Sequence, residues 1–127
     1  MMRTLLMLAL LAVAAPGLAD PGKAMVITSV ERPVQCIAPI DVYEVDGRLR
    51  DMNSLGFELE PGMHTLKGRA RISSSTCPVM RGNEVGDVPP LEYEFEAGKT
   101  YWVGLDHSAS NRRSWRYTVW KVEDSHD

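Results

Sequence analysis

Apolar and polar residues alternate along most of the chain beyond residue 24, which is the pattern of half-buried β-strands. The clearest segment runs from Phe57 to Ile72. It alternates up to Leu59, reaches Glu60-Pro61-Gly62, and alternates again from His64 onward. Proline presets a negative φ and glycine accepts the positive φ of a type II turn, so the three residues predict a tight turn. We therefore expect this segment to form a central β-hairpin.

The second half of that segment has two chemically different faces. One face is small or apolar and consists of Leu66, Gly68, Ala70 and Ile72. The other is polar and mainly basic and consists of Thr65, Lys67, Arg69 and Arg71. Farther along the chain, an acidic row, Glu92, Glu94 and Glu96, alternates with Leu91, Tyr93 and Phe95. If the two strands are neighbours, the charged rows predict cross-strand ion pairs worth a few tenths of a kcal/mol each. If they lie in different sheets, each row is a surface open to a partner.

Further strands are expected over residues 24–30, 34–37, 40–45, 48–52, 100–106 and 115–122. Pro39 indicates an edge strand or a bulge between two of them, because proline cannot donate to a β-ladder. Asp46-Gly47 predicts a hairpin with a type I′ turn. No helical period is found after the first 19 residues. The fold class predicted is all-β: a single antiparallel β-sandwich of about seven short strands with one disulfide.

The first 19 residues have the composition of a secretory signal peptide. Arg3 supplies a short positive region, an apolar run follows from Leu5 to Ala15, and small residues end at Ala19. The alternative is a membrane anchor, but the run is shorter than the roughly 20 residues that a bilayer requires. We expect residues 1–19 to be removed, leaving a periplasmic or secreted domain over residues 20–127.

Charge and cysteine content limit the possible partners. Without Arg3, 13 basic and 17 acidic residues give a net charge of −4. This mild acidity argues against nucleic acid, which requires a clustered basic surface. Cys36 and Cys77 are the two cysteines. An isolated pair outside the cytoplasm predicts a structural disulfide, and the absence of C-x-x-C disfavours a redox pair. Cys77 would then fix the irregular stretch 73–90 as a surface loop.

Aromatic residues give the most specific candidate for a binding site. Trp102 alternates with inward-facing neighbours, and in the last strand Arg116, Thr118 and Trp120 share one face. An exposed pair of Trp102 and Trp120 near Arg116 would suit stacking on sugar rings or anchoring a protein partner. The alternative is that both tryptophans are packed beneath the 73–90 loop, since large aromatic side chains are mostly buried.

Candidates for catalysis or metal binding are weaker. Met63, His64, Met80 and His107 could supply soft copper ligands, but their spacing matches no metal motif. A histidine in a turn or at a strand end is more often solvated, and we expect no metal or other cofactor. Residues 73–76 offer hydroxyl groups without a nucleophile motif. The acidic row at 92–96 lies on an outward face, which provides no pocket to make a general acid.

Three motifs together resemble the small all-β modules of bacterial envelope proteins, including PEGA-type domains and related periplasmic or lipoprotein sequences. They are Asp46-Gly47, Leu59-x-Pro61-Gly62-x-His64, and Ala97-Gly98-Lys99-x-Tyr101, within roughly residues 40–105. The chain differs from those relatives in lacking a lipidated cysteine and in standing alone with a disulfide. The resemblance implies a β-sandwich, an envelope location and a binding or structural role, with no catalytic residues to carry over.

The function expected from the sequence is that of a non-catalytic envelope module. Its partner would be another envelope protein or a cell-wall glycan, bound at Trp102, Trp120 and Arg116. The alternative is a periplasmic metal-handling protein or small hydrolase that uses His64 and His107.

Overall fold

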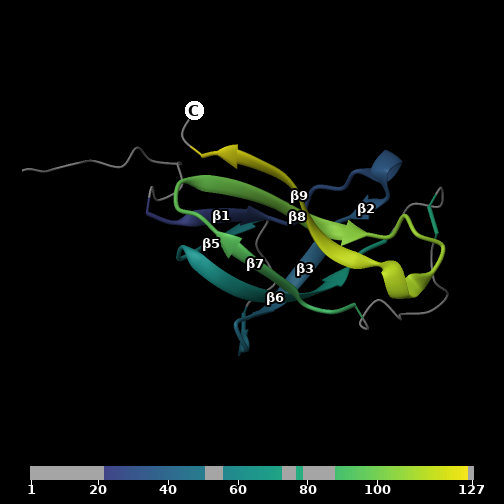
Figure 1. Cartoon of the computed structure of the whole chain (residues 1–127), viewed down its shortest axis with the longest axis horizontal. Helices are drawn as coiled ribbons and strands as arrows, with labels where there is room; N and C mark the ends of the chain where they lie inside the picture. The colour runs from purple at the N-terminus through teal and green to yellow at the C-terminus, as the bar shows by residue number, and fades with distance from the viewer. Residues whose placement is uncertain (1–21, 51–55, 73–76, 79–87, 126–127) are drawn as a thin grey trace, which may run out of the picture.

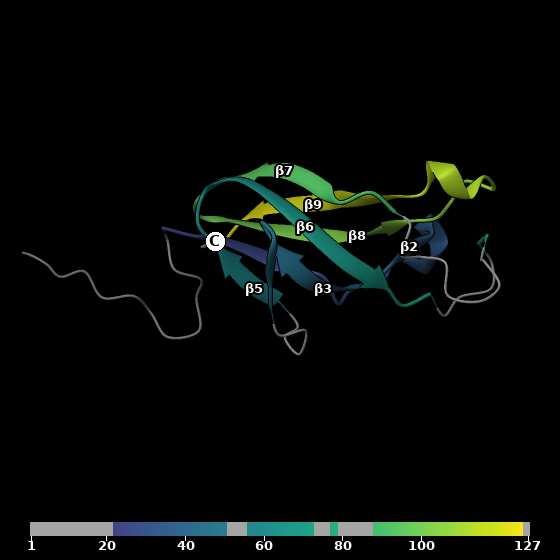
Figure 2. The same cartoon turned by 90° about the horizontal axis from the view of Figure 1, so that it is seen from below.

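The computed structural model describes residues 22–50, 56–72, 77–78 and 88–125, so the predicted signal peptide lies outside the described residues. Nine short strands in these ranges form two sheets that pack face to face (Figure 1 and Figure 2). They contain no α-helix, and none of their helical turns is long and apolar enough to cross a membrane. The predicted all-β class and β-sandwich architecture are confirmed, with nine strands instead of about seven.

The first sheet, sheet A, is built around β8 (Lys99–Asp106). This strand pairs with β1 (Ala24–Ile27), β2 (Ile37–Ala38) and β9 (Arg116–Asp124), and β5 (Gly56–Leu59) pairs with β1. The β1–β8 pair is parallel, which departs from the antiparallel sandwich that the sequence predicts. The side-chain alternation that revealed these strands is the same for either direction, so it could not distinguish them.

The second sheet, sheet B, has the strand order β4-β3-β6-β7 and is antiparallel throughout. Its strands are β3 (Ile40–Val45), β4 (Arg48–Leu49), β6 (Gly62–Ala70) and β7 (Leu91–Phe95). Between β3 and β4, Asp46 has φ 53° and Gly47 has φ 83°. Positive φ at both central residues is the signature of a type I′ turn, so this predicted hairpin is confirmed.

The central hairpin predicted over 57–72 is wrong. β5 belongs to sheet A and β6 to sheet B, so the turn at Glu60-Pro61 carries the chain from one sheet to the other. The expected positive φ of Gly62 is present, at 128°. Leu59 and Leu66 are both buried, because crossing lets each strand direct its apolar face into the same core from opposite sides. Alternation identifies the buried face of a strand but not its neighbour.

The strand β2 that precedes Pro39 lies at the edge of sheet A, as one of the two alternatives predicted, and Pro39 itself marks a second crossing between the sheets. It lies between β2 in sheet A and β3 in sheet B, and it is buried. Its missing N–H is not needed there, while its carbonyl accepts a 2.9 Å hydrogen bond from the N–H of Arg71. Residues 34–37 were expected to begin the strand, but Pro33–Gln35 forms a 3-10 turn, η1. The proline at its first position favours such a turn.

The charged rows also pair differently from the prediction. β6 and β7 are neighbours, but Leu66 lies opposite Leu91, so the basic row of β6 extends beyond the start of β7. The basic side chains meet carboxylates of β3 instead: Lys67 Nζ lies 3.6 Å from Glu44, and Arg71 Nε lies 3.1 Å from Asp41. The acidic row of β7 remains exposed to solvent.

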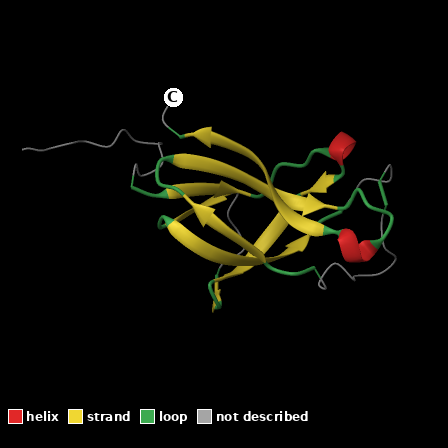
Figure 3. Ribbon diagram, in the orientation of Figure 1, coloured by secondary structure: helices red, strands yellow, loops and turns green. Residues whose placement is uncertain are grey.

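The core is formed by the inner faces of both sheets. Its most deeply buried side chains are Val26, Ile40, Val42, Leu66, Phe95, Val103 and Leu105. Trp115 is the tryptophan that fills the core, and it is only 3% exposed. The second 3-10 turn, η3 (Arg112–Ser114), lies at the same end of the sandwich as η1 (Figure 3).

Candidate functional site

Two tryptophans lie together on the outer face of sheet A. On β8, Tyr101, Val103 and Leu105 point into the core, which places Trp102 on the other side. Its ring centroid lies 6.3 Å from that of Trp120 on β9, with the ring planes inclined by 50°. Both side chains are half-buried. The two rings thus lie together on one face, as alternation predicts, but they do not form the exposed pair that was expected.

A β-bulge and a glycine allow Trp120 to lie over β8. The register shifts after Trp102, and Trp120 is the additional residue on β9. A Cβ built on Gly104 would come 2.6 Å from Ile37 Cγ2 and 3.5 Å from Trp120 Nε1. Gly104 thus leaves the space that the side chains of Ile37 and Trp120 occupy. The indole N–H of Trp120 is buried without a hydrogen-bond partner in the described part of the chain.

Each tryptophan lies next to a cation. The Arg32 guanidinium is 5.0 Å from the centre of the Trp120 ring, and Lys121 Nζ is 4.6 Å from that of Trp102. We call these four residues the aromatic face. Arg116 was expected beside the tryptophans. Arg116 lies opposite Asp106, four residues before Trp120. The guanidinium that covers the Trp120 ring belongs to Arg32 instead.

A groove of about 520 Å³ runs beside Trp102 on the same side of the sheet. Its lining residues are Ile27, Thr100, Trp102, Glu123, Asp124 and Ser125. The Thr100 and Ser125 hydroxyl oxygens lie 2.7 Å apart. Both carboxylates form ion pairs, Asp124 with Lys99 at 3.1 Å and Glu123 with Lys121 at 3.2 Å. The groove therefore combines an aromatic wall with hydroxyl groups and anionic oxygens.

Several residues of the groove and the aromatic face were not predicted from the sequence. The last strand was predicted to end at residue 122, whereas β9 continues to Asp124 and supplies one wall of the groove. Only polar residues follow Val122, so alternation gave no signal for this extension. Arg32 lies far from Trp120 in sequence and precedes a different strand, so no local pattern connects the two.

The two histidines of the alternative function lie at opposite ends of the sandwich. His64 is near the start of β6, across from Tyr93, whereas His107 follows the last residue of the eight-residue strand β8. An eight-residue strand spans roughly 26 Å, which no shared metal ion or substrate atom could bridge. Met80 and residues 73–76 lie outside the described residues. Within the described ranges, no group of three or more His, Cys, Asp or Glu side chains could hold a metal ion.

His107 is not the solvated histidine that its strand-end position predicts. It is 2% exposed, its Nδ1–H donates a 2.9 Å hydrogen bond to the Pro78 carbonyl oxygen, and its ring lies edge-on to Trp115. Next to it, the predicted Cys36–Cys77 disulfide is confirmed, with the Cα atoms 5.7 Å apart. His107 therefore fastens Pro78, which follows Cys77, to the core.

We compared the chain with models of protein families, with curated proteins and with solved structures, and none gave a significant match. The resemblance to PEGA-type envelope modules thus remains a prediction from turn motifs and alternation.

Proposed function

We propose that this protein is a non-catalytic binding module of the bacterial cell envelope, periplasmic or secreted, and that it binds a cell-wall glycan at its aromatic face. The observation that carries the proposal is the groove beside Trp102. The sequence of residues 1–19 and the disulfide support the location, because disulfides persist in oxidising compartments.

The chemistry of the groove suits a sugar. A pyranose ring has apolar C–H faces and a rim of hydroxyl groups. The indole of Trp102 offers a flat apolar surface for such a face. Thr100, Ser125 and the carboxylates of Glu123 and Asp124 offer hydrogen-bond partners for the rim. Each carboxylate lies in an ion pair with a lysine, and its oxygens can also accept hydrogen bonds from the hydroxyl groups of a sugar.

The unpaired indole N–H of Trp120, within the described part of the chain, also suggests that this side chain does more than stabilise the fold. A buried N–H without a partner costs free energy in the folded protein. A smaller apolar residue over Gly104 would avoid this cost. We infer that the ring face of Trp120, and not its buried N–H, serves recognition.

A protein partner is the second candidate, and one observation favours it. Val34, at 96% exposure, is the most exposed large apolar residue among those described. The turn that presents it is closed by hydrogen bonds between the backbones of Arg32 and Ile37, and Arg32 covers Trp120. Tryptophan and arginine are enriched where protein partners bind most strongly, and a fixed turn loses little entropy on binding.

The test uses the purified mature, disulfide-bonded protein. It would be sedimented with peptidoglycan sacculi and titrated with β-1,4-linked N-acetylglucosamine oligosaccharides, with tryptophan fluorescence as the readout. We expect Trp102→Ala to lose at least roughly tenfold in affinity, in the range of a binding hot spot. The matched control is Met63→Ala, which truncates an exposed apolar side chain of sheet B. Circular dichroism would verify that both variants are folded.

Equal binding by wild type and Trp102→Ala, or no binding by the wild type, would reject the glycan proposal. The protein candidate would be tested by affinity capture from envelope extract with wild-type, Val34→Asp and Trp120→Ala copies. A partner that the wild type holds and both variants lose would favour it. A partner that all three copies hold would place the contact elsewhere.

A further inference from the structure

The imidazole of His64 faces a hydrogen-bond acceptor at each of its nitrogens. Nδ1 lies 2.5 Å from Asp46 Oδ2, and Nε2 lies 2.6 Å from the carbonyl oxygen of Glu60. A backbone carbonyl can only accept a hydrogen bond, and so can an ionised carboxylate. Both ring nitrogens must therefore carry a proton, which makes His64 an imidazolium in this arrangement.

These contacts join two turns that are distant in the sequence. Asp46 is the first residue of the β3–β4 turn, and Glu60 lies in the crossing from β5 in sheet A to β6 in sheet B. Asp46 is held further by Thr65, whose N–H donates to Asp46 Oδ1 at 2.8 Å and whose carbonyl accepts from the Asp46 N–H at 2.8 Å. His64 is thus the connection between a hairpin and an inter-sheet crossing.

We propose that His64 is a pH-sensitive latch: its imidazolium fastens the β3–β4 turn to the crossing between the sheets, and loss of one ring proton releases one of these two turns. A neutral imidazole has a single N–H, so it can satisfy Asp46 or Glu60 but not both. The other acceptor would then face a nitrogen lone pair at hydrogen-bond distance, which is repulsive.

The surroundings of the ring favour the charged form. The carboxylate of Asp46 and the backbone and carboxylate of Glu60 attract the imidazolium, while Lys23 partly neutralises Glu60 at 3.7 Å and Arg48 lies close enough to influence Asp46. From β7, the residue opposite His64 is Tyr93, and the uncharged ring of Phe95 lies 6.0 Å away.

Burial by itself lowers the pKa of His64. The hydrogen bonds to Asp46 and Glu60 and the attraction of their carboxylates outweigh it, so the pKa lies above its usual value. For a group whose pKa is raised by folding, the stabilisation is complete below the unfolded value near 6.5 and is lost as the pH rises through the folded value. The latch therefore holds near and below pH 6.5 while Asp46 remains ionised, and it opens as the pH rises through the raised pKa of His64.

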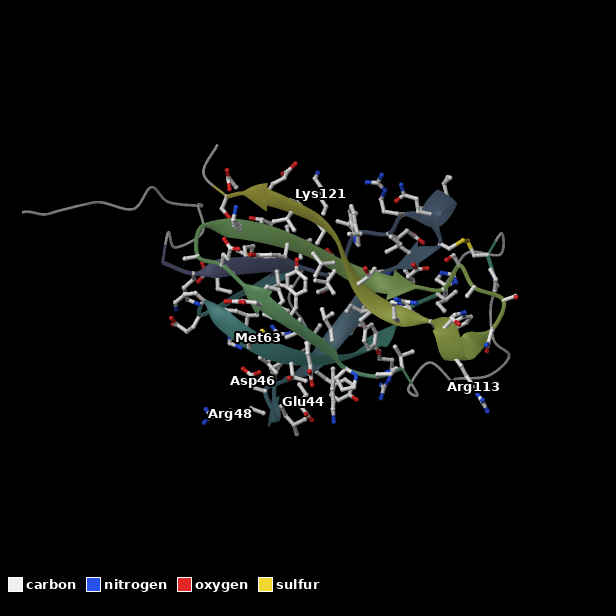
Figure 4. The ribbon with its side chains drawn as sticks, in the orientation of Figure 1. Glu44, Asp46, Arg48, Met63, Arg113 and Lys121 are labelled. Carbon is white, nitrogen blue, oxygen red and sulfur yellow. A yellow bond between two sulfur atoms is a disulfide. The ribbon has the colours of Figure 1, made fainter. Side chains whose placement is uncertain are left out.

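The latch is separate from the proposed binding surface. Asp46 and Arg48 lie on the side of the molecule opposite Lys121 of the aromatic face (Figure 4). The proposal therefore stands whether or not the aromatic face binds a ligand. An envelope protein experiences the pH of the medium, which gives such a device a signal to follow.

The experiment is an NMR titration of the intact, disulfide-bonded protein, with the imidazole signal of His64 assigned by its loss in His64→Gln. We expect its pKa to exceed that of a free histidine and to fall in Asp46→Asn. The control is Asp124→Asn, which removes an exposed, lysine-paired carboxylate at the far edge of sheet A and should leave the pKa unchanged.

Amide hydrogen exchange provides the second readout. The protection factor of the Thr65 N–H should fall roughly tenfold as the pH passes the pKa of His64, as expected for the loss of one charge-assisted hydrogen bond, while a core amide such as Leu105 keeps its protection. A His64 pKa at or below the usual value, or a Thr65 protection factor that does not respond to it, would overturn the proposal. If Asp46→Asn does not fold, the wild-type titration and exchange still decide the question.

Discussion

The hydroxyl of Tyr117 donates a 2.6 Å hydrogen bond to the carbonyl oxygen of Gly68, which joins β9 of sheet A to β6 of sheet B through the core. Burial raises the pKa of Tyr117 to about 12, so the hydroxyl remains a donor at any physiological pH. The bond fixes the position of one sheet relative to the other.

Tyr117→Phe should destabilise the protein by about 1–3 kcal/mol, because it leaves the Gly68 carbonyl without this donor. Urea denaturation followed by circular dichroism would measure the change. Tyr43→Phe, at a half-buried position, is the control and should cost less than about 0.5 kcal/mol. Equal losses in the two variants would show that the Tyr117 hydroxyl has no special role.

Removing the disulfide should destabilise the protein strongly. Cys36 and Cys77 are 41 residues apart in sequence, and the chain-entropy model gives roughly 4 kcal/mol for a crosslink of that size. We expect a double Cys36→Ala/Cys77→Ala variant to unfold at much lower urea concentration than wild type. Thiol titration of the native oxidised protein should find no reactive group, and two titratable thiols would contradict the structure.

Gly104→Ala should disturb both the fold and the aromatic face. The new Cβ would come 2.6 Å from Ile37 Cγ2 and 2.8 Å from the carbonyl oxygen of Ala38, and the backbone of β2 cannot easily move away. We expect a loss of about 1–3 kcal/mol, as for overpacking, and a shift of tryptophan emission because Trp120 packs over the same position. Unchanged emission and stability would mean that the packing around Gly104 is looser than described.

Stability should also fall in acid because of Asp46. The hydrogen bond from the Thr65 N–H, followed by that from His64, lowers the pKa of its carboxyl group. A lowered pKa contributes stability above the unfolded value near 3.8, and this contribution is lost as the pH falls through the folded value. Melting temperatures of wild type and Asp46→Asn should therefore converge in strong acid. A constant difference between them at every pH would contradict this assignment.

Removing the cation over Trp120 should change its fluorescence. Arg32→Gln eliminates a guanidinium 5.0 Å from the ring centre, a contact worth about 0.5–1 kcal/mol at an exposed site. We expect a shifted emission maximum and a small loss of stability. Arg113→Gln, at an exposed position in η3, is the matched control and should change neither. If both variants behave alike, Arg32 does not rest on Trp120 in solution.

Local chemistry in the sequence was sufficient for the Asp46-Gly47 turn and for the buried faces of several strands. Asp46-Gly47 predicted its type I′ turn because few residue pairs accept positive φ twice. Alternation correctly placed Leu66, Phe95 and Leu105 in the core and Trp102 outside, since successive side chains of a strand point to opposite faces. The disulfide followed from the presence of two cysteines in a chain predicted to be exported.

The sequence by itself thus determined an all-β chain, the buried face of each strand and the bond between Cys36 and Cys77. Only the tertiary structure decided which strands pair: the crossings at Pro39 and Glu60-Pro61, the parallel β1–β8 pair, and the placement of Arg32 over Trp120. The physical reason is that alternation is a property of one strand, whereas pairing depends on the total apolar surface that two whole sheets can bury together. The contacts of His64 arise in the same way, because they need two turns that meet only after both sheets have formed.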